Sequence, residues 1–551
     1  MRRKKQRLVT DASIPKPPHP SCWGASNQSR RSNHIMFRLA TLPLAGTLAL
    51  SLFAQHGAAP AGSPPAAAAN QSAAAAAPAP PKVEEKTSKT AHSITINGQT
   101  IKYTTVAGTT VLKKEDGTPT ASIFYIAYTK DDVADLSKRP LTFAFNGGPG
   151  SSSVWLHMGT LGPKRVVMDP EGNPAPPPYK FTDNEYSLLD LTDLVFIDPV
   201  STGYSRAVAE NTARNFHGMK GDIESVGEFI RLYTTRNGRW ESPKFLAGES
   251  YGTTRAAALS GYLQGDLGMN LNGIMLISSV LNFGAIRFDP GNDLPYPLFL
   301  PTYTATAWYH KKLPADLQAA GLQKAIDESR RYAAGPYTAA LFKGDSITAE
   351  ERAAVIKNLA RLTGLSPQFI DESNLRIRGG RFEKELLRDQ RRTVGRYDSR
   401  LEGVDEDAAG SNPEYDPSYA SVQGAFTAAF NQYVRTDLKF ETDLPYEVLT
   451  GRVNPWSFQD YENRYVNVAP TLREAMTQNP ALHVFVGAGY YDLATPLFSA
   501  EYAVSHMGLD PKLRDHISIG YYEAGHMMYT QLKSLQKARQ DLGKFMSACL
   551  P

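Results

Sequence analysis

The feature that most constrains the fold of this chain is a series of short apolar runs separated by segments with helical spacing. Segments 223–234 and 253–264 have such spacing. Buried strands that alternate with helices form a mostly parallel sheet covered on both faces, because each crossover places a helix on one face. The sequence therefore predicts an α/β fold with strands at 141–145, 194–197, 245–247, 274–277 and 484–486.

A hairpin is predicted ahead of this series. Residues 94–96 and 100–103 alternate between apolar and polar side chains, and Asn97-Gly98 lies between them. Asn-Gly supplies the positive φ angles that a tight two-residue hairpin turn requires. Residues 121–128 (ASIFYIAY) read as a further strand.

The alternation stops between residues 288 and 445, where the chain turns polar and helical. Helices are predicted at 314–334, 348–363, 381–393 and 419–436. A helical insertion in an α/β sheet is most simply a cap over the active site; the alternative is an independent interaction domain. We therefore expect a core at 88–287, a cap at 288–445 and the rest of the core at 446–551.

The N-terminal 56 residues are typical of a secretory leader. Residues 1–38 hold nine Lys or Arg and one acid, and residues 39–53 are apolar with small residues beyond. Fifteen residues are short for a membrane span, which needs ~20, but an uncleaved anchor is the alternative reading. Met36 just before this pattern suggests an upstream extension. The Ala- and Pro-rich stretch 57–87 reads as a linker, so the folded part is expected to be periplasmic or secreted.

The charge of the chain depends on this leader. The full 551 residues have a formal net charge of +4, whereas without residues 1–38 the chain has 50 basic and 54 acidic residues, a net of −4. The charge balance therefore suggests neither nucleic acid nor an anionic membrane as a partner. Two cysteines, with no CxxC and no HExxH, exclude a disulfide-stapled fold, a cysteine-rich zinc site and a zincin.

A nucleophile elbow is predicted at Ser250. Residues 248–252 (GESYG) match G-x-S-x-G, with a short apolar strand before them and a good helix former after them. Strand, tight turn and helix lift a serine hydroxyl out at the end of the strand. The alternative is a serine in a structural turn.

A serine nucleophile needs a histidine base and an orienting acid. His526 follows a predicted strand in a glycine-bearing turn and is the preferred base, whereas His506 and His516 read as surface or packing residues. Asp492 lies just past the end of a buried strand, where active sites gather in such sheets. Asp510 and Asp515 are rivals that read as solvated residues. The chain order of serine, acid and histidine is that of the α/β-hydrolases.

Residues 146–150 (NGGPG) follow a buried strand and can present backbone N–H groups to an oxyanion. One of these N–H groups, with that of Tyr251, would form the oxyanion hole. The alternative is a phosphate cradle, but no lysine follows at Walker spacing and the turn is not G-x-G-x-x-G.

These blocks together resemble the serine carboxypeptidases, and within that family the bacterial, secreted branch. The resemblance is carried by residues 146–153 (NGGPGSSS), 197–205 (IDPVSTGYS), 248–252 (GESYG), 524–527 (AGHM) and Asp492, which span most of the chain beyond the leader.

The resemblance implies an α/β-hydrolase fold with a helical cap, no metal or organic cofactor, and removal of the last residue from peptides with a free C-terminus. It implies acidic working conditions as well, because Glu249 can bind a carboxylate well only when protonated. The implied roles are Ser250 as nucleophile, His526 as base, Asp492 as its orienter, the Gly148 and Tyr251 N–H groups as oxyanion hole, and Asn146, Gly147 and Glu249 as the carboxylate-binding residues.

Two departures from the family pattern stand out. Ser151 replaces the usual Cys, and Cys549 would be alone once Cys22 leaves with the leader. Thr160 replaces a second Glu that usually pairs with the one at Glu249, so the pH profile is expected to shift upward. Alternative functions are an esterase or acyltransferase on the same scaffold and a non-catalytic envelope binding protein.

Overall fold

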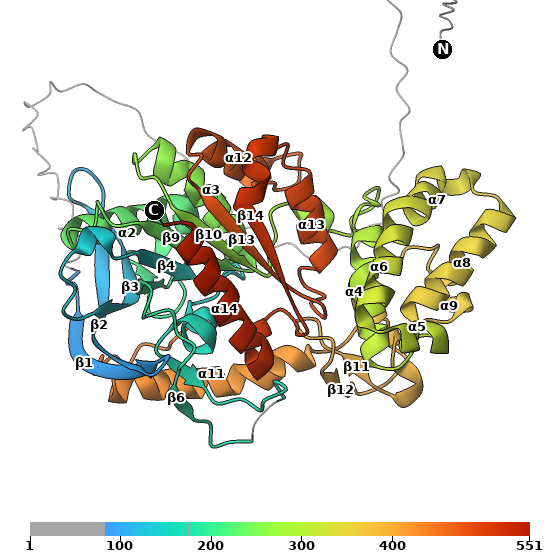
Figure 1. Ribbon diagram of the computed structural model, residues 1–551, viewed down its shortest axis with the longest axis horizontal. Helices are drawn as coiled ribbons and strands as arrows, with labels where there is room; N and C mark the ends of the chain where they lie inside the picture. The colour runs from blue at the N-terminus through green and yellow to red at the C-terminus, as the bar shows by residue number, and fades with distance from the viewer. Residues whose placement is uncertain (1–82, 174–175, 551) are drawn as a thin grey trace, which may run out of the picture. The chain divides into compact units, whose positions relative to one another are not determined.

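The central element of the computed structural model, which describes residues 83–173 and 176–550, is a ten-stranded sheet (Figure 1). Its order is β1-β2-β3-β7-β4-β9-β10-β13-β14, and β8 pairs with β3 beside this path. The strands are β1 (Thr87–Ile96), β2 (Gln99–Lys113), β3 (Pro119–Lys130), β4 (Leu141–Phe145), β7 (Asp193–Ile197), β8 (Arg206–Ala207), β9 (Lys244–Glu249), β10 (Gly273–Ile277), β13 (His483–Gly489) and β14 (Ile517–Tyr522).

The strand directions make the sheet mixed. β1, β2, β3 and β7 pair antiparallel, and every pair from β7 through β4, β9, β10 and β13 to β14 is parallel. The predicted hairpin is confirmed, with φ of 50° at Asn97 and 76° at Gly98. The sheet is mostly parallel, helices connect its parallel strands, and it carries an antiparallel edge, as in α/β-hydrolases. The α/β prediction is therefore also confirmed.

Helices cover both faces because successive strand residues point to opposite sides. In β10, Ile274 and Leu276 belong to one buried cluster, and Met275 and Ile277 belong to the other. The first face is covered by α2 (Met219–Arg236), α3 (Tyr251–Gly265), α12 (Ala469–Gln478) and α13 (Leu497–Ser505), and the second by α11 (Pro417–Thr436) and α14 (Leu532–Ala548).

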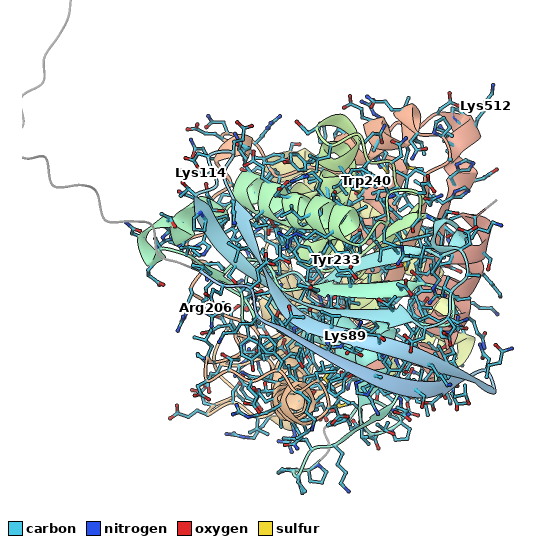
Figure 2. The ribbon with its side chains drawn as sticks, turned by 90° about the vertical axis from the view of Figure 1, so that its left-hand side faces the viewer. Lys89, Lys114, Arg206, Tyr233, Trp240 and Lys512 are labelled. Carbon is cyan, nitrogen blue, oxygen red and sulfur yellow. The ribbon has the colours of Figure 1, made fainter. Side chains whose placement is uncertain are left out.

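Figure 2 looks onto the antiparallel edge of the sheet, with α2 lying on one side of the strands. Tyr233 of α2 packs edge-on against Tyr125 and Phe143, with ring centroids 5.7 and 5.8 Å apart. Such contacts seat the helix on the sheet.

A separate group of helices lies beside the carboxyl ends of the parallel strands (Figure 1). It has a buried cluster of its own that includes Phe299, Tyr303, Leu359 and Phe382. Its helices are α4 (Pro295–Tyr309), α5 (Ala315–Ala320), α6 (Leu322–Tyr332), α7 (Thr338–Lys343), α8 (Ala349–Thr363), α9 (Pro367–Glu372) and α10 (Gly379–Glu385).

The helix predicted at 381–393 ends early. α10 stops at Glu385, and Arg391 takes a left-handed φ of 55° that interrupts a right-handed helix. The β-branched pair Thr393–Val394 then forms β11, which pairs with β12 (Glu402–Gly403).

The helix α11 differs in its packing from α4–α10. Its residues Phe426, Phe430 and Tyr433 join the buried cluster on the second face of the main sheet. The predicted cap boundary at residue 445 stays a prediction. The predicted leader (residues 1–56) and most of the predicted linker lie outside the described residues. Among helices of the described part, none combines the length and apolarity that crossing a membrane requires.

Candidate active site

Ser250 lies at a sharp turn between β9, which ends at Glu249, and α3, which begins at Tyr251. Its φ of 60° and ψ of −130° fall in a region that costs a non-glycine residue about 1–3 kcal/mol. A Cβ atom at Gly248 would lie 2.2 Å from the carbonyl oxygen of Gly252, so only glycine allows the turn to close. These features match the predicted nucleophile elbow.

Asp492 and His526 meet although 34 positions separate them in the sequence. Asp492 lies beyond β13 and His526 beyond β14, and these neighbouring parallel strands bring the two loops together. Oδ2 of Asp492 lies 2.7 Å from Nδ1 of His526. Oδ1 accepts the backbone N–H groups of Ala494 and Thr495 at 2.8 and 2.9 Å, which fix the carboxylate.

The surroundings of His526 favour its charged form. Burial lowers its pKa, but the charge of Asp492 and the hydrogen bond to it outweigh burial, and Glu249 adds to them, so the net shift is upward. The ring stacks on Tyr397 with centroids 5.0 Å apart. An imidazole held in this way, with Nδ1 toward a carboxylate, keeps Nε2 free to accept a proton.

The loop after β4 packs against the elbow. A Cβ atom at Gly147 would lie 2.4 Å from the backbone nitrogen of Tyr251, so a side chain there would block the approach of the two segments. Gly148 has a φ of +99°. Among the described residues, neither the N–H of Gly148 nor that of Tyr251 donates a hydrogen bond to the protein. Both donors are therefore available to a ligand oxygen.

Arg255 ties this loop to the elbow, a contact that the motifs did not predict. It is 1% exposed, and its guanidinium donates to Oδ2 of Asp222 at 2.8 Å and to the carbonyl oxygen of Asn146 at 2.6 Å. The same group lies over the rings of Phe145 and Tyr251. Arg255 therefore holds the two segments that supply the free N–H groups.

Asn146 and Glu249 lie side by side on one flank of Ser250. Oδ1 of Asn146 accepts the N–H of Leu156 at 3.1 Å. Its buried Nδ2 makes no hydrogen bond of good geometry among the described residues, but the Asn146 side chain lies close enough to Glu249 to lower the pKa of that carboxyl. Oε2 of Glu249 accepts a 2.6 Å hydrogen bond from the hydroxyl of Tyr529. Sequence motifs do not reveal Tyr529, which follows His526 by three positions.

The charge state of Glu249 is set mainly by its burial. Removal from water raises its pKa to about 7, against the opposing effects of His526 and of the Tyr529 hydrogen bond. Glu249 can therefore donate a hydrogen bond in mildly acidic conditions, when it is protonated, and repels anions when it is ionised.

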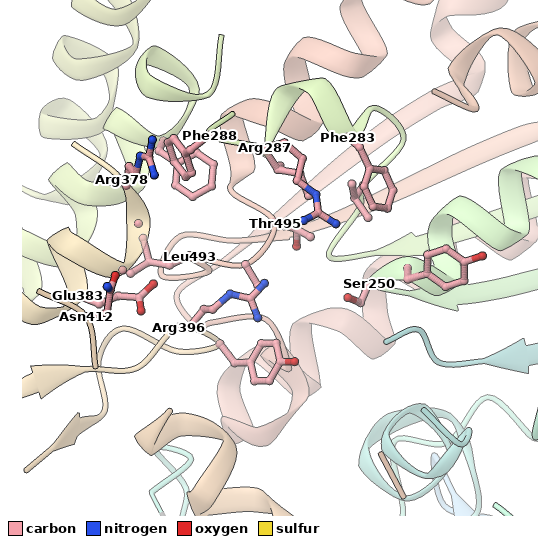
Figure 3. A pocket seen from close by; sticks show the side chains of 18 of the residues that line it. Ser250, Phe283, Arg287, Phe288, Arg378, Glu383, Arg396, Asn412, Leu493 and Thr495 are labelled. Atoms are coloured by element: carbon pink, nitrogen blue, oxygen red, sulfur yellow. The ribbon is translucent and has the colours of Figure 1, made fainter. Parts of the chain in front are cut away.

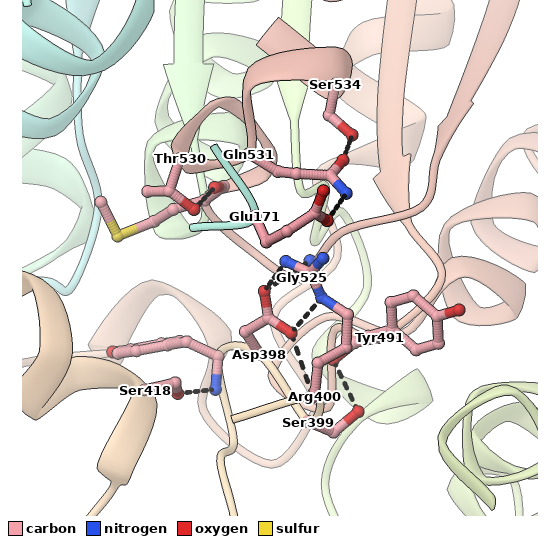
Figure 4. A network of polar contacts seen from close by, with 12 residues as sticks. Glu171, Asp398, Ser399, Arg400, Ser418, Tyr491, Gly525, Thr530, Gln531 and Ser534 are labelled. Carbon is pink, nitrogen blue, oxygen red and sulfur yellow. Dashed lines mark hydrogen bonds and ion pairs between the residues drawn. The ribbon is translucent and has the colours of Figure 1, made fainter. Parts of the chain in front are cut away.

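A segment between β11 and β12 contacts both the loop that carries Asp492 and the loop that carries His526 (Figure 4). Asp398 pairs with Arg400 at 2.6 Å and accepts the N–H of Gly525, next to His526, at 3.2 Å. Ser399 donates its hydroxyl to the carbonyl oxygen of Tyr491, next to Asp492, at 3.0 Å. The helical region thus reaches the site through this segment.

Two cavities meet at Ser250. The smaller, of about 30 Å³, is lined by Asn146, Gly147, Glu249 and His526 among others. The larger, of about 440 Å³, opens toward the helical region and is shown in Figure 3. Gly148, Ser250 and Tyr397 line both.

The structure therefore brings all eight predicted site residues to one place. The alternative candidates for the base and the acid lie elsewhere. His506 ends α13 at the surface, and His516 stacks on His483 with ring centroids 4.1 Å apart. Asp510 caps a short helix through the N–H of Lys512.

Comparison with known proteins shows the family. The family model for serine carboxypeptidases matches residues 104–531. A pheromone-processing carboxypeptidase KEX1 of Coprinopsis cinerea is 33% identical over 134 residues, covering 24% of this chain and 20% of that protein. Serine carboxypeptidase-like 50 of Arabidopsis thaliana is 26% identical over 262 residues, covering 46% of this chain and 51% of that protein. The chain thus spans about half or less of the length of these relatives.

The solved structure of a prohormone-processing carboxypeptidase from Saccharomyces cerevisiae has the same fold. Its TM-score is 0.50 at 16% identity, with 81% of this chain and 91% of that chain covered. The family match covers well over half of the sequence. This chain belongs to the serine carboxypeptidase family.

Proposed function

We propose that the protein is a serine carboxypeptidase that releases the last residue of peptides with a free C-terminus. One observation carries the proposal. The buried pair Asp492–His526 lies beside Ser250, and Asn146 and Glu249, which can bind a carboxylate, lie beside the same serine. This reaction requires a nucleophile, a base, and a site that binds the terminal carboxylate one residue away from the bond that is cleaved.

In this proposal Ser250 Oγ attacks the last peptide carbonyl while His526 Nε2 takes the hydroxyl proton. Asp492 holds the other ring nitrogen and stabilises the imidazolium that forms. The oxyanion receives the N–H groups of Gly148 and Tyr251. The C–N bond breaks, the leaving amine takes the proton from His526, and water then hydrolyses the acyl-enzyme with His526 as base.

The substrate's terminal carboxylate would lie in the smaller cavity, against the backbone of Gly147. Nδ2 of Asn146 and the protonated carboxyl of Glu249 would each donate a hydrogen bond to it. Charge-assisted bonds of this kind are about twice as strong as neutral ones, so the site would discriminate against C-terminal amides.

We further propose that the enzyme is secreted or periplasmic and of the bacterial branch. The leader-like residues 1–56 and the motifs that resemble that branch support this; the relatives described above come from fungi and a plant. Cell fractionation with N-terminal sequencing of the mature protein tests the location. Recovery of an intact leader on cytoplasmic protein would contradict it.

The activity is tested with a blocked dipeptide, its C-terminal amide and a simple ester, each with wild type and Ser250→Ala. A carboxypeptidase prefers the free acid strongly over the amide and loses all turnover in the variant. Turnover of the ester alone would instead identify an esterase or acyltransferase. Failure to label with a fluorophosphonate would favour a non-catalytic binding protein.

A further inference from the structure

The larger cavity beside Ser250 lies on the side away from Asn146 and Glu249. A peptide whose terminal carboxylate is at those two residues has its scissile carbonyl at Ser250 and must continue on the opposite side. The cavity of about 440 Å³ opens there and has room for more than one side chain. It is therefore the place for the residues before the scissile bond.

Three arginines from different segments line this cavity (Figure 3). Arg287 follows β10, Arg378 precedes α10, and Arg396 lies between β11 and β12. Within the described part of the chain, none of the three guanidinium groups forms an ion pair; Asp416 accepts the backbone N–H of Arg396 at 3.1 Å. Nearby arginines do have partners, since Arg376 pairs with Asp293 and Arg400 with Asp398.

The cavity has one acidic group against these three cations. Glu383 lines it and is 6% exposed. Burial raises its pKa to about 7, and Arg396 opposes that shift. Even when ionised, Glu383 can neutralise only one of the three guanidinium groups. The lining therefore keeps an excess of positive charge.

Apolar side chains surround these cations. Phe283, Phe288, Phe299 and Leu493 form walls of the same cavity. They can contact the methylene groups of a ligand. Guanidinium groups also match carboxylates geometrically.

We propose that this cavity selects peptides with an Asp or Glu side chain on the N-terminal side of the scissile bond. The inference rests on the proposed function for the direction in which the peptide runs. Arg287, Arg378 and Arg396 would favour this class of acidic peptides.

The test uses blocked peptides with one leaving residue and either Glu or Gln at the one or two positions before the scissile bond. Wild type is expected to cleave the Glu peptides with a kcat/KM roughly tenfold higher, the order of a charge-assisted hydrogen bond. Added salt, to about 0.5 M, should reduce this ratio by screening the exposed guanidinium groups. Equal kcat/KM values for Glu and Gln peptides would overturn the proposal.

Variants of the three arginines test whether the preference for Glu peptides arises in this cavity. Arg287→Gln, Arg378→Gln and Arg396→Gln should each lower the Glu-to-Gln ratio of kcat/KM, and the triple variant should abolish the preference for Glu. Arg381→Gln is the matched control, because Arg381 is an exposed arginine of α10 that does not line the cavity. A ratio that survives in the triple variant would contradict the assignment.

A binding measurement separates this inference from the proposed function. Calorimetry with Ser250→Ala compares the same Glu and Gln peptides without turnover. Tighter binding of the Glu peptide, lost in the triple arginine variant, supports the inference whichever bond the active enzyme cleaves. Equal affinity, or no binding of either peptide, overturns it. Absence of C-terminal release by wild type would contradict the proposed function alone.

Discussion

The hydroxyl of Tyr529 donates a 2.6 Å hydrogen bond to Oε2 of Glu249, and both side chains are buried. The Tyr529 ring lies against Gly159, where a Cβ atom would come within 2.2 Å of it. Thr160, the neighbour of Gly159, is the position where the resemblance to serine carboxypeptidases predicts a second glutamate. In this chain a neutral phenol therefore partners Glu249.

Removal of this hydroxyl should shift the pH dependence of substrate binding. The Tyr529 hydrogen bond lowers the pKa of Glu249, so Tyr529→Phe should raise that pKa further. Preference for the free acid over the amide is expected to fall as pH rises through about 7 in wild type, because Glu249 then ionises. In the variant this fall should occur at higher pH.

The measurement is the ratio of kcat/KM for a free-acid peptide and its amide, from pH 5 to 9. Tyr522→Phe is the control, because Tyr522 also donates to a carboxylate, that of Asp541, at 2.9 Å but outside the site. A Tyr529→Phe profile that coincides with wild type would contradict a role for this bond.

Glu249→Gln should remove the pH dependence itself. Glutamine keeps an N–H donor for the substrate carboxylate but cannot ionise. The acid-to-amide ratio is then expected to stay constant through pH 7, where the wild-type ratio falls. A variant that retains the wild-type fall would show that another group titrates there.

Asp492→Asn should reduce kcat by roughly 10³–10⁴-fold, because the histidine loses the carboxylate that holds its tautomer. It should also move the acidic limb of kcat/KM to lower pH, since the charge of Asp492 raises the pKa of His526. The rate and its pH profile are measured beside Asp510→Asn, whose carboxylate caps a surface turn. Equal activity of the two variants would exclude Asp492 as the orienting acid.

Loss of the ion pair between Asp398 and Arg400 should destabilise the protein and displace the loops that carry Asp492 and His526. Asp398 and Arg400 are 11% and 6% exposed in their side chains, and breaking a buried pair costs about 3–5 kcal/mol. Asp398→Ala leaves Arg400 and the N–H of Gly525 without their acceptor. We expect a lower denaturant midpoint together with a lower kcat. Unchanged stability and kcat would show that the segment does not position these loops.

Local patterns were enough to predict the sheet and the hairpin, and they single out Ser250, Asp492 and His526, whose catalytic roles stay a prediction. Ser250 lies in a turn that its own neighbours dictate, and His526 and Asp492 each follow a strand, where the carboxyl edge gathers them. Tyr529, Arg255 and Asp398 could not be found in this way. Their roles depend on contacts between segments far apart in sequence, and no local signal distinguishes a tyrosine that meets Glu249 from one that packs in the core.

The same limit explains the error at residues 381–393. Their polar and apolar spacing suits a helix, but pairing of Thr393–Val394 with Glu402–Gly403 decides the structure, and that pairing is not visible in the segment itself. The position of the helical region, from which Arg378 and Arg396 line the larger cavity together with Ser250, likewise depends on tertiary packing.

The most direct test of the proposed carboxypeptidase activity is mass spectrometry of a peptide library after digestion with wild type and with Ser250→Ala. We predict loss of single residues from free C-termini by wild type alone, with C-terminal amides spared. Cleavage at internal bonds, release from amides at the same rate, or full activity of the Ser250→Ala variant would contradict it.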